Sequence, residues 1–130
     1  MTDLAVRPPR RVRQEAHRAA VEARDTSQLV TELQSVLGQA LIAVLTGRDV
    51  RTVARWTAAT PTRPPLETER VLRDALQVQQ LLLSVDAADV VRAWFMGMNP
   101  QLEDFSPIEA LAEGRARDVM AAARAFANAG

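Results

Sequence analysis

The sequence predicts an all-α protein, and three observations support that class. Ala, Leu, Arg, Glu and Gln, which favour helices, dominate the 130 residues. The strict alternation of apolar and polar residues that is typical of strands never runs far. Apolar residues instead recur at the spacing of amphipathic helices. We expect six to seven helices, which form a helix-turn-helix N-terminal unit followed by a small helical C-terminal unit.

Composition limits the class of protein further. The chain is 48% hydrophobic and 25% charged, which is typical of a globular protein, and no apolar run approaches the ~20 residues of a membrane span. Residues 1–13 lack the apolar core of a secretory signal. The absence of cysteine excludes disulfides and thiolate chemistry and indicates a cytoplasmic protein.

Charge is distributed unevenly along the chain. All sixteen basic side chains are arginines. Residues 1–65 carry ten of them against six acidic residues, and residues 66–130 carry six against ten acidic residues. The uneven distribution favours an anionic partner such as nucleic acid for the first half, with chance clustering as the alternative.

The first 25 residues are expected to form a basic arm. Two prolines and crowded arginines in "RPPRRVR" predict an extended conformation for residues 1–13. Residues 14–24 favour a short helix whose thin apolar stripe makes it marginal without a partner. Thr26 or Ser27 is expected to cap the next helix.

The next segments predict two helices and a tight turn. A firm amphipathic pattern begins after the expected cap and comprises Leu29, Val30, Leu33, Val36 and Leu37. Gly38 breaks this helix or joins it to a short apolar helix over 40–45. Gly47 suits the left-handed position that ends a helix. Asp49 can then cap a third helix over 50–58.

Two longer helices are expected after the prolines of "TPTRPP". The first covers 66–83, with an inward face of Val71, Leu72, Ala75, Leu76, Gln79 and Leu83. The second begins at Asp86, ends near Gly97 and carries Val90, Val91, Trp94 and Phe95. A loop, "NPQLEDF", follows.

The last part of the chain predicts two short helices. Ser106 and Glu109 have the spacing of a capping box, with Pro107 at the first helical position. This helix stops at Gly114. A final helix over 115–127 places Val119, Met120, Ala123 and Phe126 on one face. Each feature of the Ser-Pro-x-Glu segment has a structural role, which favours architecture over chemistry.

Residues 39–58 match the geometry of a helix-turn-helix. Such a unit needs a small residue where the helices approach, a turn residue with positive φ and apolar residues facing a shared core. The required types occur around Gly47, with Ile42 and Ala43 before it and Val53 and Trp56 after it. One position departs, because Arg48 stands where an apolar residue is usual. We expect Val50 to take over its packing role.

The third helix collects its arginines on one face. At ~100° per residue, Arg51, Thr52 and Arg55 fall on one side. The other side carries Val50, Val53, Ala54, Trp56 and Thr57, so Trp56 is expected in the core rather than stacked on bases. The arginine face predicts DNA contacts in the major groove, with Arg48 and Arg63 at phosphates. The alternative is a solvated charged face, which any amphipathic helix carries.

The sequence resembles the Xre/MbcA/ParS antitoxin family. "TVARWTA" (52–58), followed by prolines and an apolar helix, is one part of the resemblance, and "AWFMGMNPQLEDFSPIEALAEGRARDVMAAARAF" (93–126) is the more specific part. The matching positions in the second part are Trp94, Asn99, Leu102, Ser106, Pro107, Glu109, Leu111 and Gly114. The resemblance covers roughly 27–127. The basic arm and the small tail "ANAG" depart from the family pattern.

The resemblance implies a protein partner and a regulatory role. The resemblance implies that the chain binds a toxin of the RES type, a class of toxin that consumes NAD. It also implies that the chain represses its own operon and assembles into dimers or larger oligomers. On this basis we expect domains at 1–25, 26–63 (DNA binding) and 64–130 (dimerisation and toxin binding). The partner contacts are expected among exposed groups of the last helix and tail, namely Arg117, Arg124, Phe126 and Asn128.

No enzymatic activity is expected. His17 is the only histidine, no ligand cluster has metal spacing, and no Gly-rich phosphate loop is present, so we expect no catalytic residue, metal or cofactor. Two alternatives to an antitoxin stay open. One is a free-standing repressor without a toxin, as in a temperate phage or prophage. The other is an interaction module whose helix-turn-helix binds no DNA.

Overall fold

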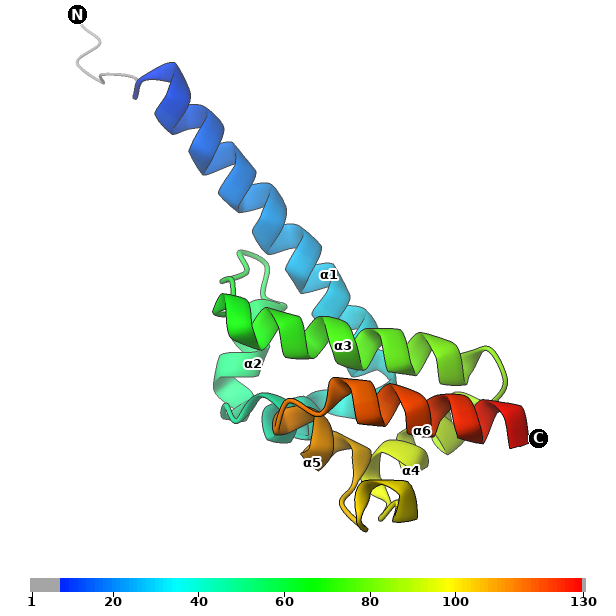
Figure 1. The fold of residues 1–130 in the computed structure, drawn as a ribbon. Helices are drawn as coiled ribbons and strands as arrows, with labels where there is room; N and C mark the ends of the chain where they lie inside the picture. Colours follow the sequence, from blue (N-terminus) through cyan, green and yellow to red (C-terminus); the bar gives the residue numbers. More distant parts are fainter. Residues whose placement is uncertain (1–7, 130) are drawn as a thin grey trace, which may run out of the picture.

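The computed structural model describes residues 8–129, and for 17, 18 and 20–24 it describes the backbone alone. Within this range the regular elements are all helical, which confirms the predicted class (Figure 1). They are α1 (Arg10–Thr46), α2 (Val50–Trp56), α3 (Leu66–Leu83), α4 (Ala88–Met96), the 3₁₀ helix η1 (Pro100–Leu102), α5 (Pro107–Ala112) and α6 (Ala116–Ala129).

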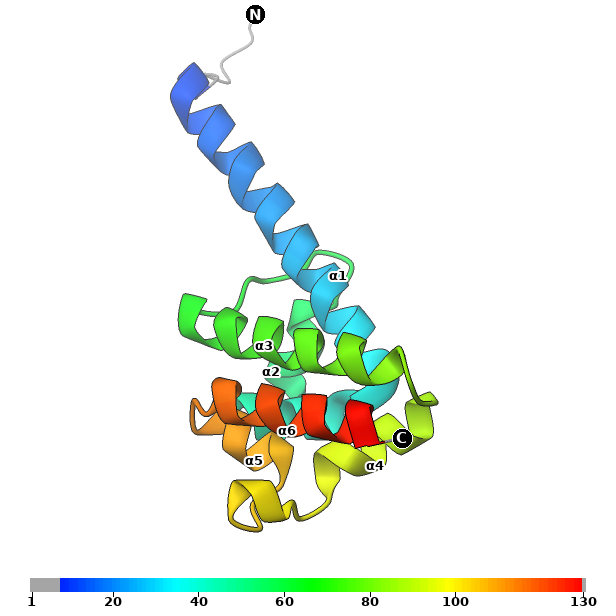
Figure 2. The ribbon, with the colours of Figure 1, turned by 45° about the vertical axis from the view of Figure 1, so that its right-hand side comes forward.

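Helix α1 begins much earlier than the sequence suggested. It starts at Arg10 and projects away from the rest of the molecule (Figures 1 and 2). The expected extended conformation is therefore wrong for 10–13, and residues 1–7 of that segment lie outside the described residues. Pro8 and Pro9 stand just before the helix, where a missing N–H group leaves no intrahelical hydrogen bond unmade.

The expected helix cap at Thr26 or Ser27 is also wrong. Helix α1 runs straight through both residues, because strong helix formers precede them and no glycine or proline interrupts the chain there. The Thr26 side chain is buried and donates a hydrogen bond to Glu69 instead of capping a helix.

Gly38 divides α1 into two helical parts, as predicted. Its φ of 79° and ψ of 162° are non-helical and produce a kink between 10–37 and 39–46. The second part ends at Gly47, whose φ of 67° lies in the left-handed region. The chain can then turn directly into α2.

One hydrophobic core joins both halves of the chain. Helices α3 and α6 pack along each other, and both views show them side by side (Figures 1 and 2). The largest fully buried apolar side chains come from α1, α3, α4, η1 and α5, and include Leu33, Leu37, Ile42, Leu72, Leu82, Phe95, Leu102, Ile108 and Leu111. Val53 and Trp56 belong to the same core; α2 packs mainly on α1, which in turn packs on α3, α4 and α5.

The second half of the chain differs from its prediction in detail. On α3, Leu82 is buried and Leu83 is exposed, which reverses the expectation for Leu83. Helix α4 begins at Ala88 rather than Asp86, because the amides of Val85 and Asp86 still bond to the Leu82 carbonyl at the end of α3. Inside the expected loop, the chain forms the short helix η1.

The capping box at the start of α5 is confirmed. Ser106 Oγ accepts the Glu109 amide at 3.1 Å, and Glu109 Oε1 accepts the Ser106 amide at 3.1 Å. Hydrogen bonds from Ser106 lower the pKa of Glu109. Gly114, with φ 84°, reverses the chain between α5 and α6. The segment therefore has the structural role that its sequence indicated.

One segment, Asp25–Thr46, is long and apolar enough for a membrane span on length and composition alone. The expectation that no run approaches this length is thus too strict. In the structure the Gly38 kink interrupts the segment, and its apolar side chains, such as Leu33 and Ile42, pack into the core. Its apolar character therefore has an explanation within the fold.

Candidate functional site

The turn between α1 and α2 is held by local hydrogen bonds. The amide of Arg48 donates to the Ala43 carbonyl at 3.1 Å, and that of Gly47 to Val44 at 3.3 Å. Asp49 accepts the Thr52 amide at 2.7 Å, which confirms the predicted cap. This hydrogen bond is the main cause of the lowered pKa of Asp49. The second part of α1, the turn and α2 therefore form a helix-turn-helix.

Helix α2 has a buried face and a cationic face. Val53 is fully buried and Trp56 is 2% exposed, which confirms the prediction that Trp56 packs in the core. Arg51 and Arg55 are exposed on the opposite side, and Thr52 is half-buried beside them. The arrangement gives α2 a buried apolar side and a solvent-facing arginine side.

The positions flanking the turn differ from expectation. Val50 is 45% exposed, so the prediction that it replaces the missing apolar residue at position 48 is wrong. Val53 and Trp56 fill the inner face of α2, which leaves Val50 at its edge. Arg48 is exposed and borders an open hollow of about 320 Å³ beside Val44 and Glu67.

Three arginines of this segment are available to an anion. Arg48, Arg51 and Arg55 are exposed, and none of the acidic side chains that the structure describes forms an ion pair with them. The hydrogen bonds from Thr52, and to a smaller extent the charges of Arg51 and Arg55, lower the pKa of Asp49. The face therefore presents three exposed arginines, none of them ion-paired to a described acidic side chain, where a ligand can reach them.

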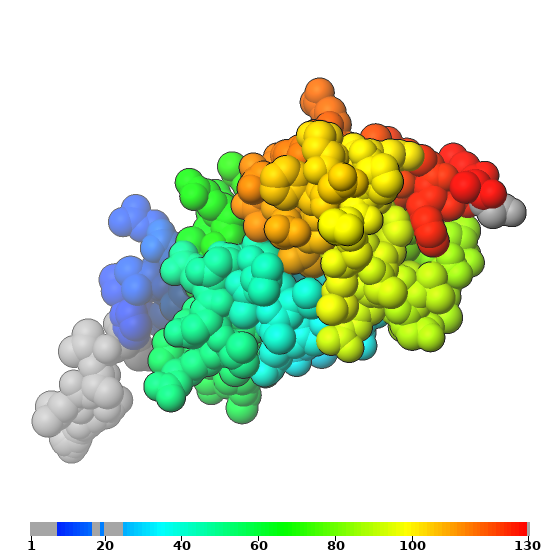
Figure 3. Space-filling model, turned by 90° about the horizontal axis from the view of Figure 1, so that it is seen from below, coloured from blue at the N-terminus to red at the C-terminus, as the bar shows by residue number. Residues whose placement is uncertain are grey.

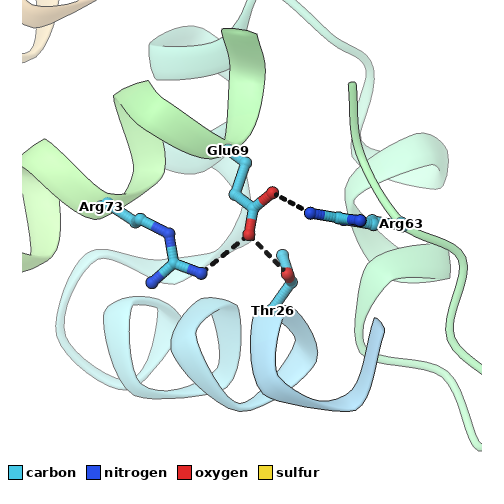
Figure 4. Close-up of polar contacts among 4 residues, drawn as sticks. All are labelled: Thr26, Arg63, Glu69 and Arg73. Carbon is cyan, nitrogen blue, oxygen red and sulfur yellow. Dashed lines mark hydrogen bonds and ion pairs between the residues drawn. The ribbon is translucent and has the colours of Figure 1, made fainter. Parts of the chain in front are cut away.

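Arg63 lies in a different environment. Its Nη2 donates to Glu69 Oε2 at 3.0 Å, and the same carboxylate accepts Arg73 Nη2 at 2.8 Å and Thr26 Oγ1 at 2.9 Å (Figure 4). Glu69 is 4% exposed. Burial acts to raise the pKa of Glu69, but the hydrogen bonds from Arg73, Thr26 and Arg63 together lower it.

Sequence reasoning missed this cluster. The only signal was the spacing of Glu69 and Arg73, which are four residues apart and so adjacent on a helix. Nothing in the sequence indicated that Thr26 and Arg63, from two other segments, would meet the same carboxylate. Arg63, which was expected to contact a phosphate, thus forms an ion pair with Glu69 within the protein.

The residues expected at a partner surface lie on two sides of α6. Arg117 and Arg124 border an open hollow of about 310 Å³ between α3 and α6, with Asp74 and Met120. Phe126 lies elsewhere, with its ring centroid 6.3 Å from that of Trp94. It borders a second hollow, of about 290 Å³, beside η1.

Asn128 is exposed and lies one helical turn after Arg124. By that spacing it shares the side of Arg124 rather than that of Phe126. The structure therefore separates the four residues into a polar group and an aromatic one.

An exposed apolar surface at the end of α4 and in the loop after it was not predicted. Met96, Met98 and Phe105 are exposed, with Met98 80% exposed. The amide of Asn99 donates to the Phe105 carbonyl at 3.1 Å, which brings the two ends of this loop together. The loop lies beside the end of α6, seen in yellow and red in Figure 3, whereas the segment of α2 lies further left.

The described residues contain no group of three or more metal-ligating side chains. His17 lies in α1, and its side chain is outside the description.

The fold and the site define a helix-turn-helix segment built into an all-helical domain. No family model and no curated protein matches the chain. Among solved structures, a chain from the M. tuberculosis MbcT–MbcA toxin–antitoxin complex is similar, with a TM-score of 0.68 and 25% sequence identity. The similarity covers 79% of this chain and 94% of that chain. The protein therefore has the fold of a chain from a toxin–antitoxin complex.

Proposed function

We propose that this protein is the antitoxin of a toxin–antitoxin system, binding DNA through α2 and a toxin through its C-terminal half. The observation that carries the proposal is the similarity to a chain of the MbcT–MbcA complex, which extends over 94% of that chain. The resemblance of the motifs at 52–58 and 93–126 to the Xre/MbcA/ParS antitoxins agrees with this proposal.

For DNA binding, the arginine face of α2 enters the major groove. Arg51 and Arg55 reach base edges, where an arginine can donate two hydrogen bonds to guanine, and Thr52 lies beside them. Arg48, at the turn, contacts a phosphate. A homodimer or higher oligomer presents two such helices to a symmetric operator, and binding there represses the protein's own operon in the cytoplasm.

For toxin binding, the C-terminal half presents several exposed groups of mixed character. The polar group of α6 (Arg117, Arg124 and Asn128) can pair with carboxylates, and Phe126 can anchor in an apolar pocket of the partner. The partner that the sequence resemblance implies is a RES-type toxin that consumes NAD. No cofactor is required for this role, because neutralisation is a binding reaction.

The proposed DNA binding is tested by removing Arg51 and Arg55, the two side chains proposed to contact base edges, which we call the readers. Arg51→Ala with Arg55→Ala should lower operator affinity by roughly 30-fold or more, since each base contact contributes about 1–3 kcal/mol. The far-ultraviolet circular dichroism signal should not change, because both side chains are exposed. Arg70→Ala with Arg92→Ala is the matched control, since it removes the same charge from exposed positions on other helices. Equal affinity of all three proteins would refute DNA reading by α2.

A free-standing repressor is the second candidate, and the projecting part of α1 favours it. Arg10, Arg11 and Arg13 are exposed there, and basic extensions of DNA-binding proteins contact phosphates or the minor groove. Co-expression with the NAD-consuming protein of a neighbouring gene separates the candidates. An antitoxin restores growth and NAD levels, and a free-standing repressor does not.

A further inference from the structure

The cluster around Glu69 joins three segments of the chain. Its carboxylate accepts Thr26 from α1 at 2.9 Å, Arg63 from the segment after α2 at 3.0 Å and Arg73 from α3 at 2.8 Å (Figure 4). Both oxygens are used, and the side chain is 5% exposed. A buried carboxylate needs such donors, since an unpaired buried charge is strongly unfavourable.

The segment after α2, residues 57–65, is attached both to α2 and to α3, and we call it the connector. Near its middle, the amide of Thr62 donates to the carbonyl of Arg55 in α2 at 3.1 Å. The next residue, Arg63, donates to Glu69. Two adjacent residues thus link the backbone of a predicted DNA reader to a buried carboxylate on α3.

This chain of contacts leads from α2 to the body of the protein. Helix α2 has only seven residues, so its orientation depends on what it packs against and on how its ends are held. Asp49 holds the first end through the Thr52 amide. The connector holds the second end through Thr62 and Arg63.

We infer that Arg63 and Glu69 are positioning residues that fix the orientation of α2, so that Arg51 and Arg55 reach the same groove together. This inference rests on the proposed DNA binding and replaces the earlier expectation that Arg63 contacts a phosphate. Thr26 links α1 to the same cluster, because its hydroxyl, in the part of α1 before the Gly38 kink, donates a hydrogen bond to the Glu69 carboxylate.

The two roles for Arg63 predict different salt dependences. A phosphate contact releases a counterion, so its loss lowers the salt slope of binding by about one on any DNA. A positioning residue acts only through the readers. Its loss lowers affinity for the preferred sequence and leaves both the salt slope and the affinity for scrambled DNA unchanged.

Glu69 offers a test in which the sign of the effect decides. Removal of a negative charge should strengthen DNA binding if only the overall field changes. Loss of a positioning contact should weaken binding to the preferred sequence. Glu113→Gln is the matched control, because Glu113 is an exposed glutamate that does not line the hollow beside Arg48.

The experiment uses the full chain and a duplex that the wild-type protein selects from a random library, with a scrambled duplex as reference. Glu69→Gln and Arg63→Gln should each bind the selected duplex at least 10-fold more weakly, with scrambled-duplex affinity within twofold of wild type. Glu113→Gln and Arg73→Gln should stay within twofold on both duplexes. Arg73 also contacts Glu69, but from α3 itself, so its loss leaves the connector attached.

A second measurement keeps the test independent of affinity. Native-state hydrogen exchange at the Thr62 amide should be faster in Arg63→Gln and Glu69→Gln than in wild type, and unchanged in Arg73→Gln. A salt slope that falls by about one on both duplexes would make Arg63 a phosphate contact and overturn the inference. Unchanged affinity and exchange in Glu69→Gln would also overturn it. A wild-type protein that selects no duplex would instead refute the proposed DNA binding.

Discussion

Trp56→Ala is the substitution that tests how α2 is held. Trp56 is 2% exposed and packs in the core beside Val53, which is fully buried. Truncating a buried aromatic side chain costs about 3–5 kcal/mol, from lost transfer free energy and from the cavity left behind. Domains of ordinary size have a free energy of unfolding of about 5–15 kcal/mol, so the variant should lose a large share of its stability.

Urea unfolding measures this loss directly. The chain has two tryptophans, so Trp94 remains as a fluorescence probe beside the circular dichroism signal. The midpoint should fall without a change in the slope with urea. Trp56→Phe is the control, because it keeps an aromatic ring in the core and should cost less. A loss below about 1 kcal/mol, together with weaker DNA binding, would mean that Trp56 contacts bases, and would refute its assignment to the core.

The remaining predictions concern the turn and the buried carboxylate. Gly47→Ala should lower the free energy of unfolding by about 1–2 kcal/mol, because the φ of residue 47 is 67°. Gly97→Ala is the control and should cost less, because the φ of residue 97 is −83°. Equal losses of stability in thermal unfolding of the two variants would contradict this. Because the folded-state pKa of Glu69 lies below its ordinary value of 4.5, its contribution to stability is present above that pH and is lost as pH falls through the folded-state pKa. Urea midpoints of wild type and Glu69→Gln should therefore converge on acidification, and a constant difference would contradict the lowered pKa.

The sequence predicted the local features well, because each depends on nearby residues. Gly38 and Gly47 were identified as breaks, since glycine tolerates positive φ. Asp49 and the pair Ser106 and Glu109 were identified as caps, since their hydrogen bonds span only three residues. Helical periodicity also placed Val53 and Trp56 on the inner face of α2, although it did not place Val50 correctly.

Features that depend on distant contacts were not predictable. Thr26 has the residue type of a helix cap, and only the approach of α3 gives it a buried acceptor, Glu69, 43 residues away in the chain. Arg63 was likewise predicted to contact a phosphate, because its partner Glu69 approaches it only in the folded structure. The long α1 was missed because the helix signal of 14–24 is marginal alone and becomes stable only as a continuation of the firm helix that follows it.

The measurement that tests the central claim most directly is purification of the tagged chain from its native host, with mass spectrometry of bound protein and sequencing of bound DNA. The account predicts an NAD-consuming toxin encoded beside the chain's own gene, together with DNA from the promoter of that operon. Arg51→Ala with Arg55→Ala should lose the DNA and keep the toxin. Recovery of promoter DNA without a toxin would contradict the antitoxin assignment, and recovery of equal DNA by the double variant would contradict the role of α2.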